Sequence, residues 1–379
     1  MTSPYFSGSD PIPPFLVGTD TAQGFRISDS TVTLTLPALQ SGSYALSLVT
    51  SQRILDVGRV DIVGFVGGRT VAPVYGTPYK VFQMYGRPLV VGGDGGLTVR
   101  SLEPATGLVT DYDGYSLPSD YGPSPSFRGR DVVVLRDSNR VAGEYRMGAA
   151  GPELLDTVGN GFPQLFTRHL VPLRDDAYLV TGSHQTSLTR AGQSFWFTTE
   201  SVWGVFLSPL GKQLVLGSSM GLPGAQVFSP SLADTLFSLP LQSVYGVAWP
   251  LDEARIFVSG GHEWDVHNHL MVIDGASGQV MVDDSVPPRT REFWSIDVSR
   301  DGSHLFVLTE VDSTTSIGVY DGTSLAQLGT LSIPRSEKRH CLSCDWGGVL
   351  VLDEAFRKVY VIIPTGYTTA VYNFDLLVD

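Results

Sequence analysis

Short apolar runs separated by tight polar turns recur along the second half of the chain. One run that opens a repeat is Val202-Trp203-Gly204-Val205-Phe206, and later copies begin near Val244 and Phe293. An aromatic residue stands near the start of each run, at 203, 245 and 294, so the steps are 42 and 49 residues. A Pro-Leu pair follows at 172, 209 and 250, with steps of 37 and 41. A fixed period of this length predicts a repeat architecture.

Each repeat reads as four short strands with polar turns between them. The third strand ends in Asp-Gly at Asp274-Gly275 and at Asp321-Gly322, and a weaker fourth strand follows. The first strands are apolar throughout, which indicates a sheet covered on both faces. The template fits seven times, with starts near Tyr79, Ser126, Phe162, Val202, Val244, Phe293 and His340. The sequence therefore predicts an all-β fold, a seven-bladed β-propeller over 67–379, with six or eight blades as alternatives.

The turn Ser299-Arg300-Asp301-Gly302 is followed by a Leu-Phe-Val strand and a Val-Tyr-Asp-Gly strand end. This combination resembles the repeats of YVTN, NHL and WD40-like propellers over residues 162–363. The WD40 signature itself is missing, because no Gly-His opens a repeat and no Trp-Asp closes a strand. The aromatic residues at 203, 245 and 294 are interpreted as packing between blades.

The first 66 residues follow a different pattern. Residues 25–38 alternate apolar or β-branched with small polar residues, and residues 41–50 repeat this after a Gly turn. A period of two predicts a hairpin with one wet face. The stretch resembles the C-terminal half of an IPT/TIG domain, which implies a small immunoglobulin-like β-sandwich segment over 1–66. The remaining strands of that family would precede Met1, so the chain is expected to be part of a longer protein or to pack the half-domain on the propeller.

Composition narrows the classes of partner. Forty-two Gly and 24 Pro among 379 residues supply many turns, and the formal net charge is −13. Nucleic acid is a poor partner for so acidic a chain, because phosphate contacts need a basic surface. No apolar run is long enough for a transmembrane segment. The first ten residues lack the pattern of a signal peptide.

The densest group of ligand-type side chains lies in residues 260–269. We predict a divalent metal site there from His262, Asp265, His267 and His269, because imidazole and carboxylate are common zinc ligands. The alternative is a solvated loop between the second and third strands of its blade. No other metal or cofactor is predicted, and Asp274, Asp321 and Asp283-Asp284 are interpreted as turn and cap residues. Cys341 and Cys344 are expected to be buried free thiols of an innermost strand.

Two functions compete. The first is a non-enzymatic binding or scaffold propeller for a protein or glycan ligand, at a cell surface or outside a cell, as the IPT/TIG resemblance implies. No catalytic residue is assigned, because the residues of a propeller site come from several blades. The alternative is a propeller enzyme of the lactonase-like or quinoprotein-like kind, with its site at the mouth of the central channel. Three or more convergent His, Asp, Glu or Arg side chains at that mouth would favour the enzyme.

Overall fold

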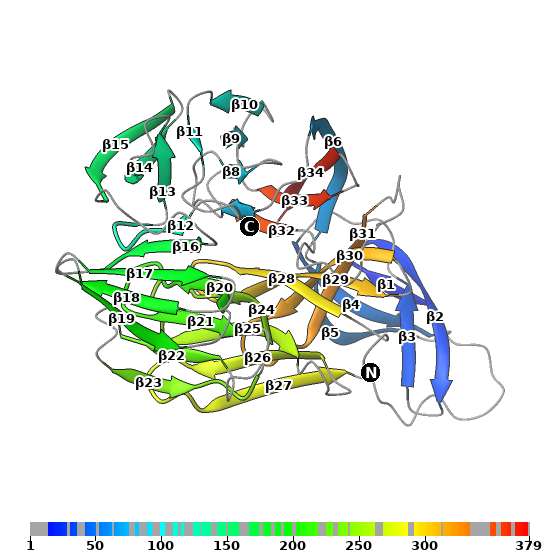
Figure 1. The fold of residues 1–379 in the computed structure, drawn as a ribbon. Coiled ribbons are helices and arrows are strands. Elements are labelled where there is room, and N and C mark those ends of the chain that lie inside the picture. The colour runs from blue at the N-terminus through cyan, green and yellow to red at the C-terminus, as the bar shows by residue number, and fades with distance from the viewer. Residues whose placement is uncertain are drawn as a thin grey trace. The chain divides into compact units, whose positions relative to one another are not determined.

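A computed structural model describes the chain as strands and short turns. The described residues are 14–28, 31–35, 42–50, 53–62, 64–75, 80–82, 89–92, 99–102, 109–112, 115–116, 124–129, 131–137, 142–148, 151–158, 167–173, 177–182, 186–190, 193–198, 202–218, 225–229, 234–241, 243–261, 268–286, 292–311, 314–333, 349–353, 358–364 and 368–377. Within these ranges every regular element is a β-strand (Figure 1). None of these ranges contains a helix long and apolar enough to cross a membrane.

The chain divides into two compact units, residues 1–67 with 375–379, and residues 68–374. The first unit holds one five-stranded antiparallel sheet with the order β3-β2-β1-β4-β5. Its strands are β1 (Phe15–Val17), β2 (Asp20–Ser28), β3 (Thr31–Thr35), β4 (Gly42–Val49) and β5 (Ile54–Ile62). Phe15, Val17 and Leu48 are buried at its centre.

The hairpin predicted in this unit is wrong. Residues 25–38 contribute to two strands, since β2 ends at Ser28 and pairs with β3. The following strand, β4, pairs with β1 and β5 instead of β3. Asp29 and Ser30 stand between β2 and β3, and both residue types favour turns. The IPT/TIG assignment stays a prediction.

In the larger unit, the described strands form seven antiparallel sheets, six of them consecutive in the sequence. The first sheet contains β7 (Lys80–Phe82), β8 (Leu89–Gly92), β9 (Val99–Leu102) and β10 (Val109–Tyr112), and the second contains β11 (Tyr115–Ser116), β12 (Ser124–Pro125), β13 (Val132–Asp137), β14 (Ala142–Gly148) and β15 (Gly151–Thr157). The third contains β16 (Thr167–Pro172), β17 (Ala177–Gly182), β18 (Thr186–Arg190) and β19 (Gln193–Thr198). The fourth contains β20 (Val202–Leu207), β21 (Leu214–Ser218), β22 (Gln226–Phe228) and β23 (Thr235–Ser238).

The next two sheets are the best described. They contain β24 (Ser243–Ala248), β25 (Arg255–Gly261), β26 (Asn268–Asp274) and β27 (Val280–Val286), then β28 (Glu292–Val298), β29 (His304–Val311), β30 (Thr314–Asp321) and β31 (Gln327–Ser332). In each, the strands follow one another in sequence order. The first strands of successive sheets contact each other, as β24 does β28 and β28 does β32. We call them inner strands and the fourth strands outer strands.

The last sheet joins the two ends of the propeller unit. Its order is β32 (Val349–Asp353), β33 (Lys358–Pro364), β34 (Thr368–Leu377) and then β6 (Gly64–Tyr75). Figure 1 shows blue β6 beside red β34. The outer strand of the final sheet thus comes from the start of the unit. This arrangement supports a closed ring, although the blade count stays a prediction.

Both faces of a central sheet are buried, as the sequence predicts. In β25, Ile256 and Val258 pack towards the β20–β23 sheet, and Phe257 between them packs towards the β28–β31 sheet. In β26, Ile273 packs towards the β20–β23 sheet and Val272 packs towards the β28–β31 sheet. A period of two on a sheet with two dry faces needs apolar residues at every position. This explains why these strands show no apolar-polar alternation.

A buried glutamine links two neighbouring sheets. The Gln213 side chain precedes β21, and its Oε1 accepts a hydrogen bond of 2.9 Å from Trp249 Nε1. Its Nε2 donates to the carbonyl oxygen of Gly275. Nearby, the backbone N–H of Leu210 donates to Glu253 Oε1. Because Gln213 and Glu253 are both buried, these bonds align the turns of the two sheets in a water-excluded seam.

The aspartates at the third-strand ends cap turns, as predicted. Asp274 Oδ1 accepts from Ser277 Oγ and from the Ser277 and Ala276 N–H groups. Asp321 Oδ1 accepts in the same way from Ser324 and Thr323. The bonds from Ser277 and Ser324 lower the pKa values of Asp274 and Asp321. The Ser303 backbone N–H lowers the pKa of Asp301 to about 2. All three carboxylates therefore stabilise Asx-type turns.

Candidate functional site

The inner strands β20, β24 and β28 each have a β-bulge near their start. In β20, Val202 pairs with Ser218 and Gly204 with Gly217, so Trp203 is the extra residue. In β24 the extra residue is Tyr245, between Val244 and Gly246. In β28 the irregularity lies between Phe293 and Ile296 and includes Trp294. The aromatic period in the sequence thus marks one structural position, repeated in three consecutive sheets.

The bulge changes the role predicted for Tyr245. We expected this residue to pack between blades, but 43% of it is exposed. Its neighbours Val244 and Val247 are buried and fill the seam instead. A bulge places one extra residue outside the alternation of the strand and redirects its side chain. Interblade packing is therefore wrong for Tyr245, and the side chains of Trp203 and Trp294 lie outside the described part of the structure.

The glycine after the bulge permits close approach of the next sheet. A Cβ on Gly246 would lie 2.9 Å from Ser259 Oγ and 3.1 Å from the backbone nitrogen of Ile296. Gly204 is equally constrained within its own strand, by the ring of Phe206. In the pair Tyr245-Gly246, Tyr245 occupies the bulge, and Gly246 allows the adjacent inner strand to approach closely.

Polar side chains on the inner strands hold the neighbouring inner strands in register. Asp297 is almost fully buried, and its Oδ2 accepts a 2.9 Å hydrogen bond from the backbone N–H of Leu352 in the next sheet. Ser295 Oγ accepts from the N–H of Leu350. Ser124 Oγ accepts from Leu170 in the same manner. An inner strand is an edge strand whose outward N–H groups need acceptors. These side chains supply the acceptors.

The predicted metal site is described only at His269. This residue is the second residue of β26, and its Nδ1 lies 3.0 and 3.2 Å from the two carboxylate oxygens of Asp283 in β27. Residues His262, Asp265 and His267 lie outside the described residues. Among the residues that the structure does describe, no three His, Cys, Asp or Glu side chains gather closely enough to hold a metal ion. A carboxylate on one ring nitrogen is a common support for a metal-bound histidine, and the metal site stays a prediction.

Zinc titration would test that site. If the four residues bind zinc, zinc should stabilise the fold by about 2.7 kcal/mol at a hundredfold excess over its Kd. The stabilisation should weaken as the pH falls through about 6.5, because protonated imidazole does not bind metal. The double change His267→Ala with His269→Ala should abolish it, and His304→Ala in another sheet should not. A melting temperature that zinc leaves unchanged would show that the metal prediction is wrong.

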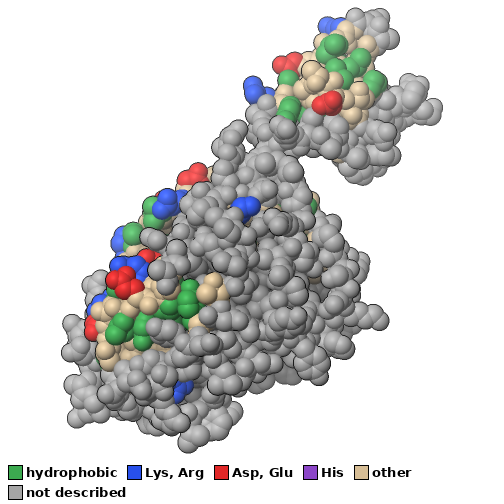
Figure 2. Space-filling view, turned by 90° about the horizontal axis from the view of Figure 1, so that it is seen from above, with side chains coloured by type: hydrophobic (Ala, Val, Ile, Leu, Met, Phe, Trp, Pro, Cys, Tyr) green, Lys and Arg blue, Asp and Glu red, His purple; other side chains and the backbone are tan. Residues whose placement is uncertain are grey.

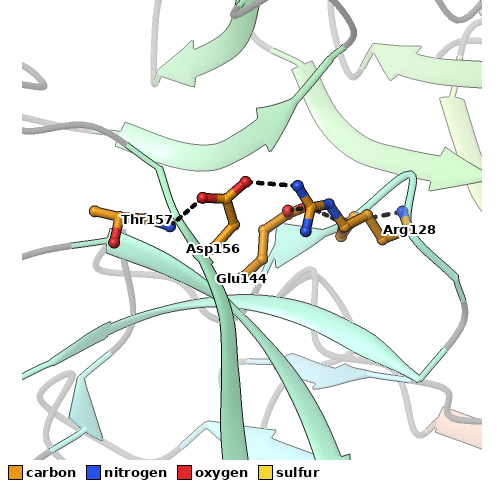
Figure 3. Close-up of polar contacts among 5 residues, drawn as sticks. Arg128, Glu144, Asp156 and Thr157 are labelled. Atoms are coloured by element: carbon orange, nitrogen blue, oxygen red, sulfur yellow. Dashed lines mark hydrogen bonds and ion pairs between the residues drawn. The ribbon is translucent and has the colours of Figure 1, made fainter.

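An ion pair between buried Glu144 and half-exposed Arg128 in the β11–β15 sheet was not predicted from the sequence (Figure 3). Glu144 is buried in β14, and its Oε2 lies 2.8 Å from Arg128 Nε. Its other oxygen accepts from Ser126 Oγ. The Arg128 guanidinium also contacts Asp156 Oδ2 at the surface, at 2.5 Å. With both Glu144 oxygens engaged, the cluster joins β12 to β14 and β15. The partners are far apart in sequence, so no local motif could reveal them.

The cysteines Cys341 and Cys344 also lie outside the described residues. The described inner strand of that sheet is β32, which begins at Val349 instead of near His340.

The Pro-Leu pairs mark the turn after the inner strand, but they do not share one position. Pro172 is the last residue of β16, whereas Pro209 and Pro250 follow the ends of β20 and β24.

Comparison with known proteins identifies the fold. No protein-family model and no curated protein matches the chain. A chain in the crystal structure of the mitotic checkpoint complex is similar, with a TM-score of 0.56, 15% identity, and coverage of 84% of this chain and 95% of that chain. The β-propeller domain of Myceliophteria thermophila Cps50 (Swd1) has a TM-score of 0.56, 11% identity, and coverage of 80% and 99%. Both are propellers of the WD40 type. The larger unit of this all-β chain therefore has the β-propeller fold.

Proposed function

We propose that the chain is a non-enzymatic scaffold that binds a protein partner where its inner strands begin. The observation that carries this proposal is Tyr245, a large aromatic residue that the bulge leaves 43% exposed on a rigid strand. Two neighbouring sheets place Trp203 and Trp294 at the corresponding backbone positions. The proposed site thus combines one exposed aromatic side chain with an aromatic residue type that recurs in three consecutive sheets.

Such residues suit protein recognition for two physical reasons. Tyr and Trp present a large apolar area with a polar tip and few rotatable bonds, so little side-chain entropy is lost on binding. Residues of these types supply a disproportionate share of the energy at protein interfaces. Hydrogen bonds such as that from Leu352 to Asp297 hold the inner strands rigid. A pre-organised surface also lowers the ordering cost of association.

The similar structures support the same proposal. One of them is a chain of a complex, the mitotic checkpoint complex. That name describes the other protein, and a propeller fold by itself does not determine function. It is consistent with a propeller used to assemble proteins. Protein is preferred here to glycan because three aromatic positions on three separate sheets would span a surface wider than one sugar unit.

A location at the cell surface or outside the cell is part of the same proposal. Its support is the resemblance of residues 28–48 to the IPT/TIG family. Labelling of intact cells with an antibody against the larger unit would test it. Signal that appears only after permeabilisation would contradict it.

Binding of selected peptides would test the scaffold site. A phage-displayed library of random peptides is selected on the full chain, and affinities are measured by fluorescence anisotropy. Tyr245→Ala should weaken the selected peptides by about 30-fold, as expected for an aromatic hot spot. Leu251→Ala is the matched control, because Leu251 is 48% exposed in the turn at the opposite end of β24. Equal affinity of every selected peptide for wild type and Tyr245→Ala would contradict the proposal.

A further inference from the structure

The outer strands carry a second repeated β-bulge. In β23, Val227 pairs with Phe237 and Phe228 with Thr235, so Leu236 is the extra residue. Met281 is the extra residue of β27, between Val280 and Val282. Leu328 is the extra residue of β31. Each of the three is the second residue of its strand, and the three strands belong to consecutive sheets.

All three bulged side chains are large, apolar and exposed. The exposed fractions are 45% for Leu236, 53% for Met281 and 39% for Leu328. The residues that follow are partly buried, since Phe237 and Val282 pack against the cores between the sheets. The bulge therefore separates an inward residue from an outward one. We call Leu236, Met281 and Leu328 the rim residues.

Protection of an edge strand explains the bulges but does not explain the rim residues. An outer strand presents unpaired N–H and C=O groups, and a bulge hinders pairing with another chain. Protective positions of this kind normally carry charged side chains, often Lys. Here the bulged, exposed position of three successive edges carries Leu, Met and Leu. Three exposed apolar side chains thus recur at one structural position in three consecutive sheets.

The charged residues of these three strand segments are acidic, and one of them, Asp283, contacts His269. Residues 234–238, 280–286 and 327–332 contain Asp234, Asp283 and Asp284 but neither Lys nor Arg. The whole chain carries a net charge of −13. Figure 2 shows Lys and Arg as well as Asp and Glu side chains among apolar ones along one margin of the larger unit, and it does not label the rim residues. A complementary surface would therefore combine large apolar side chains with Lys and Arg.

We propose that the rim residues dock a basic protein segment bearing large apolar side chains, as a second binding surface of the propeller. This surface is additional to the proposed aromatic site at the start of the inner strands. Tyr245 and Met281 lie on the first and last strands of one four-stranded sheet. A scaffold with both surfaces can hold two partners at once. Contacts on three sheets also require a partner larger than a small molecule.

Counter-selection with a rim variant tests this proposal. A phage-displayed library of random peptides is selected on the full chain and depleted on the triple variant Leu236→Ser, Met281→Ser, Leu328→Ser. The surviving peptides should carry Lys or Arg together with Leu, Ile or Phe. Their affinity should fall at least about tenfold in Met281→Ser alone and should weaken with added salt. Asp234→Asn with Asp284→Asn should also weaken them.

The controls separate this surface from the inner-strand site. Tyr245→Ala should bind the rim peptides as wild type does, and Leu251→Ser, at an exposed leucine in the turn after β24, should also leave their affinity unchanged. The melting temperature of the triple variant should match that of wild type, because its changes are at exposed positions. No surviving peptide, or survivors without basic residues, would overturn the proposal. Dimerisation of wild type that the triple variant loses, seen by sedimentation, would assign the rim to a second copy and overturn it as well.

Discussion

Gln213→Leu should lower the free energy of unfolding by about 4 kcal/mol. The side chain of Gln213 accepts from the indole N–H of Trp249 and donates to the carbonyl of Gly275. Leucine has similar volume but offers neither group, so two buried partners lose their hydrogen bonds at about 1–3 kcal/mol each. Denaturant titration would measure the change. Gln279→Leu is the control, since Gln279 is exposed and should change the free energy of unfolding by less than about 0.5 kcal/mol.

A double change sharpens the test of this seam. Trp249→Phe removes the indole donor, so Gln213→Leu should cost less in that background than in wild type. Contacting residues in one hydrogen-bond network are expected to be non-additive in this way. Strict additivity of Gln213→Leu and Trp249→Phe would show that the seam does not contain the bond between them.

Gly322→Ala should destabilise the protein by about 3 kcal/mol. A Cβ at this position would lie 2.0 Å from the backbone carbonyl oxygen of Gly302, in the turn before β29. Neither group is the flexible end of a side chain, so the two turns must separate, which strains the Gly322 N–H bond to Ser303 O. Overpacking of this kind costs about 1–3 kcal/mol and sometimes more. Thermal unfolding would measure it.

The matched control for this substitution is Gly148→Ala. In β14, the nearest atom to a Cβ on Gly148 would be the carbonyl oxygen of Gly151 at 3.8 Å, which is ordinary contact. This variant should unfold within a few degrees of wild type. If both alanine variants have the same melting temperature, the turns of the β28–β31 sheet are not packed as described.

The fold could be predicted from the sequence where a signal is local. Apolar runs, Asp-Gly turns and the aromatic period locate the strands and their turns, and the carboxylates of Asp274 and Asp321 cap turns as expected. The pairing of β6 with β34 could not be predicted, because it joins residues from opposite ends of the propeller unit. Periodicity reports which faces are buried, but it carries no information about which distant strand completes a sheet.

The candidate site was only partly predictable for a related reason. The recurrence of aromatic residues at 203, 245 and 294 was visible, but their environment was not. A bulge is set by the hydrogen-bond register with a second strand, so a single-strand pattern cannot distinguish a buried Tyr245 from an exposed one. Ion pairs such as that of Glu144 with Arg128 depend on the same tertiary register. The amino-acid composition indicated neither the exposure of Tyr245 nor the pairing of Glu144 with Arg128.

The pairing of β6 with β34 also has a consequence during translation, because the two strands are synthesised at different times. Residues 64–75 leave the ribosome about 300 residues before 368–377 do, and translation runs at roughly 5–20 residues per second. The edge strand β6 therefore waits about 15–60 s for its partner strand. Throughout that interval the ring cannot close, and a twelve-residue strand with unpaired backbone groups is available to other nascent chains. Protection of this strand during translation is thus a requirement that the fold places on the cell.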